Sequence, residues 1–476
     1  MRVSDIIGLA IDYLWLGIIG VGILGFGYWI WYCLYFKKKY PDRKINKKKL
    51  IGWGVFVIYL VVVLGATMLS RGGFFGNTKI YPLFYSYKDA WTDFSITEWR
   101  NIILNILMFV PLGFFLPQLI KKTSSLWKML IIGFLFTFCI EVLQLLLKRG
   151  VFEPDDLLGN TVGTMIGYGV YYLATYLMKK RKKKEVPNVW RVLLHQLPLL
   201  LSIGVFSTVF LIYHTKELGN MPSTCILKQK NIEVSSEIEF SNAAEEVMVY
   251  KAVVLTSNET KQMAESIFEK LGYGLDESRT DIYENTALYY SQGDDNTGNR
   301  YSLWIEYDGS IFRLTDFEKT FRNENDTPPK KDASGKEVKE ALEQIGVDMP
   351  IEAVFEKGEE GEYTFCVDKQ QMGGKLYDGC IKCTYYEDGT LGMVHYEVLA
   401  LDEHKTEEVI SEAQAYEQIQ KGYFSYFRPN DDILKVNITG IEVGYEIDTK
   451  GYYQPVYLFD GTVNGNETKL VVPAIK

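Results

Sequence analysis

NIILNILMFVPLGFFLP (residues 101–117) is the first of three stretches that decide the fold of this chain. The others are FCIEVLQLLLKR (138–149) and EPDDLLGNTVGTMIGY (153–168). Each is largely apolar, yet each carries polar residues three or four positions apart, on one face of a helix. An ionisable residue in an apolar span is costly, so it usually faces the protein interior and marks a site. The stretches predict membrane helices that share a polar pocket.

The 476 residues separate by composition into an apolar part of about 214 residues and a polar, acidic, tyrosine-rich remainder. Crossing a bilayer takes roughly 20 apolar residues, and six runs reach that length: 6–36, 50–70, 101–120, 126–147, 157–178 and 190–213. The first run is too long for a cleaved signal peptide, and lysines follow it as a stop-transfer flank does. We expect an all-α membrane bundle of about six transmembrane helices, followed by an extracytoplasmic α+β domain.

Three basic clusters predict the orientation. Lys37–Lys49 holds eight Lys or Arg residues, Lys179–Lys184 holds six, and between them stand Lys121, Lys122 and Lys128. Such runs can also bind nucleic acid, but each lies beside an apolar span on the same predicted side, which favours cytoplasmic loops. The bilayer is then a partner and nucleic acid is not. The amino terminus and residues 215–476 are expected outside. The expected domains are 1–49, 50–180, 181–214 and 215–476.

Polar side chains of three spans are the candidate pocket. Asn101 and Asn105 share a face, and Pro111 and Gly113 follow, although a kinked helix with two capping Asn residues would give the same pattern. Glu141 and Gln144 share a face of the next span, with Arg149 at its outer mouth; a structural ion pair is the alternative. The last span offers the residues Asp155, Asp156 and Asn160.

The same last span carries Gly159, Gly163 and Gly167 at intervals of four. Small residues at this spacing let another helix approach the backbone closely. Asp155 and Asp156 can instead cap the start of their own helix, which accounts for at least one of them. The glycines, with Pro111 and Gly113, are therefore predicted packing residues.

The predicted pocket suits a polar ligand, a phosphate held by Arg149, or a hard cation held by carboxylates and Asn oxygens. No nucleophile elbow, Walker loop or HExxH run is present. We expect no cofactor and no metal for a binding protein. A divalent cation at Asp155, Asp156 and Glu141 belongs only to an enzymatic alternative.

The membrane part resembles the VanZ-like family. The resemblance rests on Asn101-x3-Asn105-x3-Phe109-x-Pro111-x-Gly113, on Glu141-x2-Gln144 with Arg149, and on Asp155-Asp156-x3-Asn160-x2-Gly163-x3-Gly167-Tyr168, with Arg71 and KIYPLFYSY (79–87) upstream. It covers about residues 50–180. It implies an integral membrane protein of the bacterial envelope, of the Gram-positive type, whose family's founding member is associated with low-level teicoplanin resistance.

Residues from about 215 onward repeat one pattern, an amphipathic helix followed by alternating strands. The expected helices are 259–271, 335–345 and 411–421, each followed by a glycine of the C-cap type, and the strands include 301–307, 379–386 and 456–463. Asp308-Gly309 and Asp388-Gly389 read as hairpin turns. The last unit weakly resembles YycH/YycI and PepSY-type extracytoplasmic modules, which implies a regulatory or binding role.

Cysteines and histidines suggest no further chemistry. Cys33 and Cys139 lie in apolar spans and are expected to be buried thiols. Three disulfide connectivities remain open for Cys225, Cys366, Cys380 and Cys383. His395 and His404 are isolated and expected at the surface. The acidic residues of the predicted outer domain argue against direct binding of anionic wall polymers, unless a cation bridges the protein and the polymer.

Three functions remain open. The first is a non-enzymatic envelope protein whose outer-leaflet pocket binds a lipid-linked or peptide wall precursor, a lipid, or a glycopeptide. The second is a membrane enzyme acting on a lipid phosphate or carrier lipid. The third is a sensor or transporter with a regulatory outer domain. The oligomeric state does not follow from these patterns.

Overall fold

A computed structural model describes residues 3–39, 46–69, 80–223, 225–293, 298–321, 327–348, 353–426 and 433–476. The chain divides into two compact units. The helical unit comprises residues 1–217, and the sheet unit comprises Leu218–Tyr426 and Asp432–Lys476. Arg43, Lys44, Arg71 and Lys79, which the sequence analysis used, lie outside the described residues.

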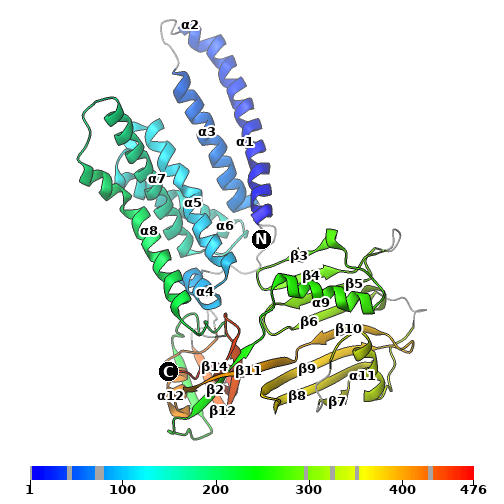
Figure 1. The fold of residues 1–476 in the computed structure, drawn as a ribbon. Coiled ribbons are helices and arrows are strands. Elements are labelled where there is room, and N and C mark those ends of the chain that lie inside the picture. Colours follow the sequence, from blue (N-terminus) through cyan, green and yellow to red (C-terminus); the bar gives the residue numbers. More distant parts are fainter. Residues whose placement is uncertain are drawn as a thin grey trace. The chain divides into compact units, whose positions relative to one another are not determined.

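The helical unit is built from long helices (Figure 1). They are α1 (Val3–Trp31, continued by a π-turn at Tyr32–Phe36 and by α2, Lys37–Lys39), α3 (Lys47–Leu64, continued by a π-turn at Gly65–Leu69), α4 (Tyr85–Asp93), α5 (Ile96–Leu119), α6 (Leu126–Leu146), α7 (Pro154–Arg181) and α8 (Val189–Thr215). Among the described residues, five segments are long and apolar enough to cross a membrane: Ile11–Lys39, Lys47–Met68, Ile96–Leu119, Leu126–Leu146 and Val189–Thr215.

The sixth expected span, 157–178, forms most of α7 but is not one of these five segments. Glycine, threonine, asparagine and tyrosine lower the mean hydropathy of α7. The helix can have this composition because it packs against α5, α6 and α8 and needs little apolar surface. Its start is tied to α5 by a hydrogen bond from Asn105 to Asp156, and Gly163 and Gly167 follow along Ile106 and Val110. Helix α7 therefore runs parallel to α5 through the same layer.

Glycine makes this close approach possible. A Cβ atom on Gly163 or Gly167 would lie 1.9 Å from the carbonyl oxygen of Ile106 or Val110, and one on Gly113 would lie 1.9 Å from that of Thr164. Gly159 would meet only ordinary contacts, at 3.6 Å or more. Helix α5 continues through Pro111, and the Tyr59 hydroxyl donates to the Met108 carbonyl one turn earlier.

The basic clusters lie at one end of the helical unit. Gly52, near the start of α3, is beside Leu119, at the end of α5, so the lysines of both segments meet there. Because α7 is parallel to α5, Lys179–Lys184 lies at the same end. At the other end, Gln144 of α6 donates to the carbonyl of Thr67.

The expectation of buried thiols in the spans was wrong. Both Cys33 and Cys139 are exposed on the outside of the helical unit. Lipid surrounds a membrane helix as an apolar medium, so an apolar thiol there has no need of a protein interior.

In the described residues of the sheet unit, the strands form one 14-stranded sheet. Its strands are β1 (Ile232–Ser236), β2 (Glu246–Ala252), β3 (Asp281–Ile282), β4 (Thr286–Tyr290), β5 (Tyr301–Glu306), β6 (Phe312–Asp316), β7 (Val354–Lys357), β8 (Glu362–Met372), β9 (Lys375–Tyr385), β10 (Leu391–Tyr396), β11 (Leu399–Glu408), β12 (Leu434–Ile447), β13 (Tyr452–Val463) and β14 (Asn466–Pro473). Their order is β1-β12-β13-β2-β11-β9-β10-β6-β5-β4-β3, with β14 beside β13 and β7-β8 beside β9. Among the strands of the described residues, only β1 and β12 pair in parallel.

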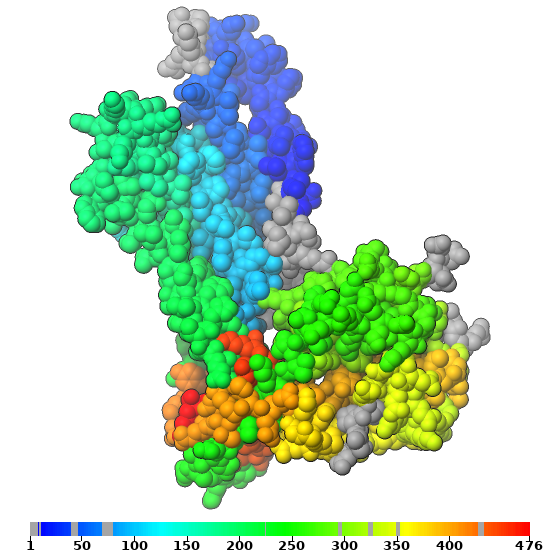
Figure 2. All heavy atoms as spheres, in the orientation of Figure 1, coloured from blue at the N-terminus to red at the C-terminus, as the bar shows by residue number. Residues whose placement is uncertain are grey.

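The three expected helices of this unit are confirmed as α9 (Ser257–Lys270), α11 (Gly335–Gln344) and α12 (Glu412–Gln420); a short α10 (Phe317–Thr320) follows β6. Each of the three begins with a capping box. Helix α9 lies across β4–β6 (Figure 1), and in the space-filling view its side chains fill that face of the sheet (Figure 2).

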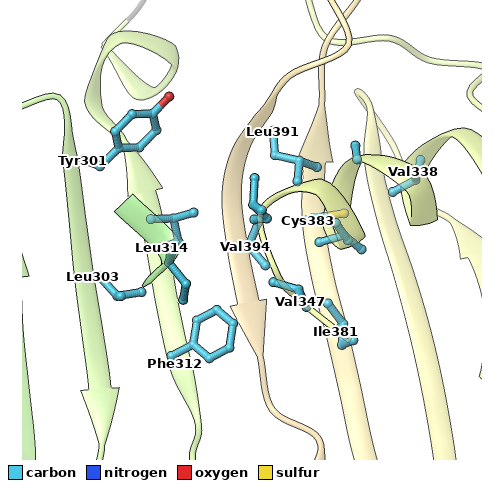
Figure 3. Packing of buried hydrophobic residues seen from close by; sticks show 14 of the residues in the cluster. Tyr301, Leu303, Phe312, Leu314, Val338, Val347, Ile381, Cys383, Leu391 and Val394 are labelled. Carbon is cyan, nitrogen blue, oxygen red and sulfur yellow. The ribbon is translucent and has the colours of Figure 1, made fainter. Parts of the chain in front are cut away.

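Two cores sit under these helices. Residues of α9 and α11 pack on β4–β6 and β8–β10, where Leu303, Leu314, Val394 and Ile381 are buried (Figure 3). Residues of α12 pack with β12–β14 in the second core. The repeated unit of a helix followed by antiparallel strands is thereby confirmed.

Glycines end the helices and shape the turns as expected. Gly272, Gly346 and Gly422 have φ of +85°, +86° and +85° after α9, α11 and α12. Gly309 and Gly389, in the turns after β5 and β9, also have positive φ.

Of the open disulfide alternatives, the structure has Cys366–Cys380, which joins directly opposed residues of β8 and β9. Among the described residues, Cys225 and Cys383 form no disulfide, and Cys383 is buried. His404 is exposed, whereas His395 is half-buried on β10, so the expectation of a surface position holds only for His404.

Candidate functional site

A cavity of about 310 Å³ lies at the end of the helical unit opposite the basic clusters. Helix α4 and the residues before it, the first turns of α5, and the start of α7 form its walls. The lining residues are polar or aromatic with few exceptions: Tyr81, Tyr85, Ser86, Tyr87, Asp89, Glu98, Asn101, Ile102, Asn105, Glu153, Asp155, Asp156 and Gly159.

Local sequence positions the walls. Phe84 and Phe94 take left-handed backbone conformations on either side of α4, so the chain turns sharply into and out of this short helix. The Ser95 hydroxyl then caps α5 by accepting from the Glu98 N–H. The Phe94 ring stacks on Tyr213 of α8, which fastens the α4–α5 corner to the bundle.

Asp155 holds α4 in place. Its two carboxylate oxygens accept hydrogen bonds from the backbone N–H groups of Phe84, at 2.6 Å, and Ser86, at 2.8 Å. The side chain is buried. The residue does cap orphan N–H groups, as one alternative expected, but they belong to the start of α4 and not to its own helix.

Asp156 and Asn105 meet inside the cavity. The Asn105 amide donates to Asp156 Oδ1 at 2.5 Å, which joins the predicted motif of α5 to that of α7. Asn101 lies one turn before Asn105 on the same wall. These groups present both donors and acceptors to a ligand.

Further acids and phenols line the side formed by α4. Burial raises the pKa of Asp89, and a side-chain hydrogen bond with Glu98 opposes part of that shift. A hydrogen bond between two carboxyl groups requires a proton on one of them. Burial and the nearby acids raise the pKa of Tyr85 to about 12, and burial with Asp155 and Asp156 does the same for Tyr87. Both phenols therefore remain protonated donors.

Four of the eight residues predicted for the pocket line the cavity: Asn101, Asn105, Asp155 and Asp156. The other four lie elsewhere. Buried Glu141 accepts from the Glu153 N–H at 3.1 Å, so it supports the segment that enters α7. Asn160 donates to Thr137 Oγ1 inside the bundle, and its own oxygen has no hydrogen-bond partner among the described residues.

Gln144 and Arg149 fasten α6 to the end of α3. Gln144 donates to the Thr67 carbonyl at 2.8 Å, and exposed Arg149 donates to the Met68 carbonyl at 3.1 Å. Arg149 does not line the cavity, so it is not positioned to hold a phosphate there. The described residues also contain no group of three or more His, Cys, Asp or Glu side chains arranged for a metal ion.

Sequence reasoning missed most of the α4 side of the cavity: Tyr81, Tyr85, Ser86, Tyr87, Asp89 and Glu98. Tyr81 to Tyr87 belong to the aromatic segment of the family resemblance, which was the available signal. Tyr85 and Asp89 are four apart on one face of α4, whereas Glu98 read as an ordinary residue of a first helical turn.

Residues 56–175 match the family model described as VanZ/LLP1. Protein VanZ of Enterococcus faecium is 25% identical over 141 residues, which are 29% of this chain and 84% of that protein. The match contains every residue that lines the cavity, and the expected family resemblance is confirmed for this segment.

Two solved structures resemble the chain more distantly. An uncharacterized protein from Eubacterium rectale has a TM-score of 0.26 and 11% identity, over 52% of this chain and 89% of that one. The Bacillus megaterium YpeB C-terminal domain has a TM-score of 0.19 and 13% identity, over 47% of this chain and 94% of that one. Scores of this size do not establish a common fold.

Proposed function

We propose that this protein, in which residues 56–175 form a VanZ-like domain within a membrane-crossing helical bundle, binds a polar ligand of the cell envelope in the cavity between α4, α5 and α7. The observation that carries the proposal is the Asn105–Asp156 hydrogen bond inside a cavity of about 310 Å³. Small-molecule sites in proteins are pockets of this size with a few placed polar groups.

The side of the membrane follows from charge. The three basic clusters gather at one end of the bundle, and basic loops favour the cytoplasm. The cavity at the other end then opens toward the outer leaflet, and the sheet unit, which follows α8, is extracytoplasmic. A ligand would reach the cavity from the envelope side.

The ligand we propose is a lipid-linked or peptide wall precursor, a lipid, or a glycopeptide that targets a precursor. Asp156, Asn101 and Asn105 would contact it, and Asp155 and Glu141 would hold the walls. Gln144, Arg149 and Asn160 would support the helices around it. Relatedness to VanZ makes teicoplanin the first drug to test.

The test is teicoplanin susceptibility of a sensitive Gram-positive host that expresses the intact chain or Asp156→Asn. Asp156→Asn removes the negative charge of a side chain that we propose contacts the ligand. Loss of one charge-assisted hydrogen bond costs about 1–2 kcal/mol, so roughly a tenfold loss of ligand affinity is expected. Protection by the intact chain should therefore fall in the variant.

Glu185→Gln is the matched control, because Glu185 is an exposed carboxylate at the opposite end of the bundle. All variants must reach equal membrane abundance. Equal protection by Asp156→Asn and the intact chain would remove the cavity from the mechanism. No protection by a well-expressed intact chain would refute the glycopeptide ligand.

A further inference from the structure

The ionisable side chains around the cavity of the helical unit are acids and phenols. Among the described residues that line it, none is Lys, Arg or His, and five carry carboxyl groups: Asp89, Glu98, Glu153, Asp155 and Asp156. The first turns of α4, α5 and α7 add about half a positive charge each, which does not offset this number of acids. The interior of the cavity is therefore negative, and it repels an anionic group.

Two tyrosines of α4 respond to this negative charge. Burial, followed by the charge of Asp89, raises the pKa of Tyr85 to about 12. Burial, followed by the charges of Asp155 and Asp156, raises the pKa of Tyr87 to about 12. Surroundings that oppose the formation of a phenolate anion stabilise a bound cation for the same reason.

The cavity suits an organic cation better than a metal ion. Its acids are spread over three helices, and the described residues contain no group of three or more His, Cys, Asp or Glu side chains that could hold a metal ion. Its volume of about 310 Å³ is much larger than one ion and lies at the lower end of the range for small-molecule sites. It can therefore enclose a charged head group and the few atoms next to it.

One part of the cavity combines aromatic rings with a carboxyl pair. The rings of Tyr81 and Tyr85 stack with their centroids 4.5 Å apart. Asp89 follows Tyr85 by one turn of α4 and shares a hydrogen bond with Glu98 of α5. Because that hydrogen bond holds one proton between two carboxyl groups, the pair carries one negative charge. Aromatic rings and a carboxylate are the groups that attract and bind an ammonium ion.

We propose that the cavity binds the primary ammonium group of its ligand in an ammonium subsite formed by Tyr81, Tyr85, Asp89 and Glu98. The inference rests on the proposed function, because it assigns the chemistry of the ligand in the same cavity. Primary ammonium groups occur on peptides and on lipid headgroups. In a lipid headgroup a phosphate lies close to the amine, and the acids of the cavity repel it, so a peptide amine fits better.

The test is calorimetric titration of the full chain in a neutral detergent at low salt. The probes are acetyl-lysine amide, its neutral analogue acetyl-norleucine amide, the anionic acetyl-glutamate amide, and phosphoethanolamine for a lipid headgroup. The lysine probe should bind roughly tenfold or more tightly than the norleucine probe, as a charge-assisted contact predicts. Tighter binding of phosphoethanolamine than of the lysine probe would support the ammonium subsite and assign the amine to a lipid headgroup.

A double variant tests the residues of the subsite. Asp89→Asn/Glu98→Gln removes the charge of the carboxyl pair and retains the size of both side chains, so it should abolish the preference for the lysine probe over the norleucine probe. Asp332→Asn/Glu185→Gln is the matched control, because both of these acids are exposed and neither lines the cavity. The control should retain the full preference, and equal losses in the two double variants would contradict the assignment.

The comparison of probes on the intact chain does not depend on how well a variant folds. Equal binding of the lysine and norleucine probes, tighter binding of the glutamate probe, or no binding of the lysine probe would each overturn the ammonium subsite. Protection against teicoplanin together with one of these results would retain the cavity as a ligand site. A preference for the lysine probe without such protection would refute the glycopeptide ligand and retain the subsite.

Discussion

At the scale of single residues, two adjacent carboxylates have different tasks. Asp155 accepts two backbone N–H groups of the α4 start, and Asp156 accepts the Asn105 side chain in the cavity. Both read from sequence as first-turn acids, and neither spacing nor helix preference separates them. Their roles depend on which elements face the first turn of α7.

Asp155→Ala should destabilise the helical unit, because it leaves two N–H groups of Phe84 and Ser86 without acceptors. A buried unsatisfied group costs about 1–3 kcal/mol. We expect a lower melting temperature of the detergent-solubilised protein and faster proteolysis near α4. Asp156→Asn retains an acceptor for Asn105 and should melt close to the intact chain; equal destabilisation by both changes would contradict these separate roles.

At the scale of elements, α7 shows that a helix of polar and small residues can belong to the bundle when it packs against other helices. Its polar and small residues make it less apolar than the five other long helices, yet it runs beside α5 along Gly163 and Gly167. The glycine spacing predicted the close approach. The partner helix and its parallel direction followed only from the tertiary structure, because a small-residue face fits any smooth helix.

Gly163→Ala should destabilise the bundle, since the added Cβ would lie 1.9 Å from the Ile106 carbonyl oxygen. Overpacking of this kind costs about 1–3 kcal/mol. Gly20→Ala in α1 is the control, because a Cβ there meets nothing within 4 Å. Thermal unfolding followed by size-exclusion chromatography should show early loss of the folded species for Gly163→Ala alone. Similar curves would mean that α5 and α7 can separate freely.

At the scale of the whole molecule, the net charge conceals two separate local charge patterns. The chain has a formal charge of -9, but basic clusters gather at one end of the helical unit and acids line the cavity at the other. Each pattern has its own consequence for orientation or binding, because fields of charges in water fade over about 10 Å.

Cysteine labelling on intact cells tests the orientation. In a background where Cys33, Cys139, Cys225 and Cys383 are replaced by Ser, Glu359→Cys should react with an impermeant thiol reagent, since the turn after β7 is exposed and expected outside. Lys182→Cys, in a basic cluster, should react only after permeabilisation. The reverse pattern would place the cavity on the cytoplasmic side and refute the proposed envelope ligand.

Local sequence by itself determined the apolar helices, the helix-and-strand units of the second half, their caps, and the glycine turns after α9, α11 and α12. Hydropathy, periodicity and turn chemistry act over a few residues, so they can be read without the fold. The spacing of polar residues in the apolar spans also predicted eight pocket residues, and Asn101, Asn105, Asp155 and Asp156 are the four that line the cavity.

Only the tertiary structure decided which side chains meet. It joined Asn105 to Asp156, directed Gln144 and Arg149 to the end of α3, paired Cys366 with Cys380, and aligned Arg313, His395 and Lys382. These contacts link residues far apart in the chain, and strand register and helix order set them. A one-residue shift in register would turn Arg313, His395 and Lys382 toward the core, and no local pattern in the sequence encodes that choice.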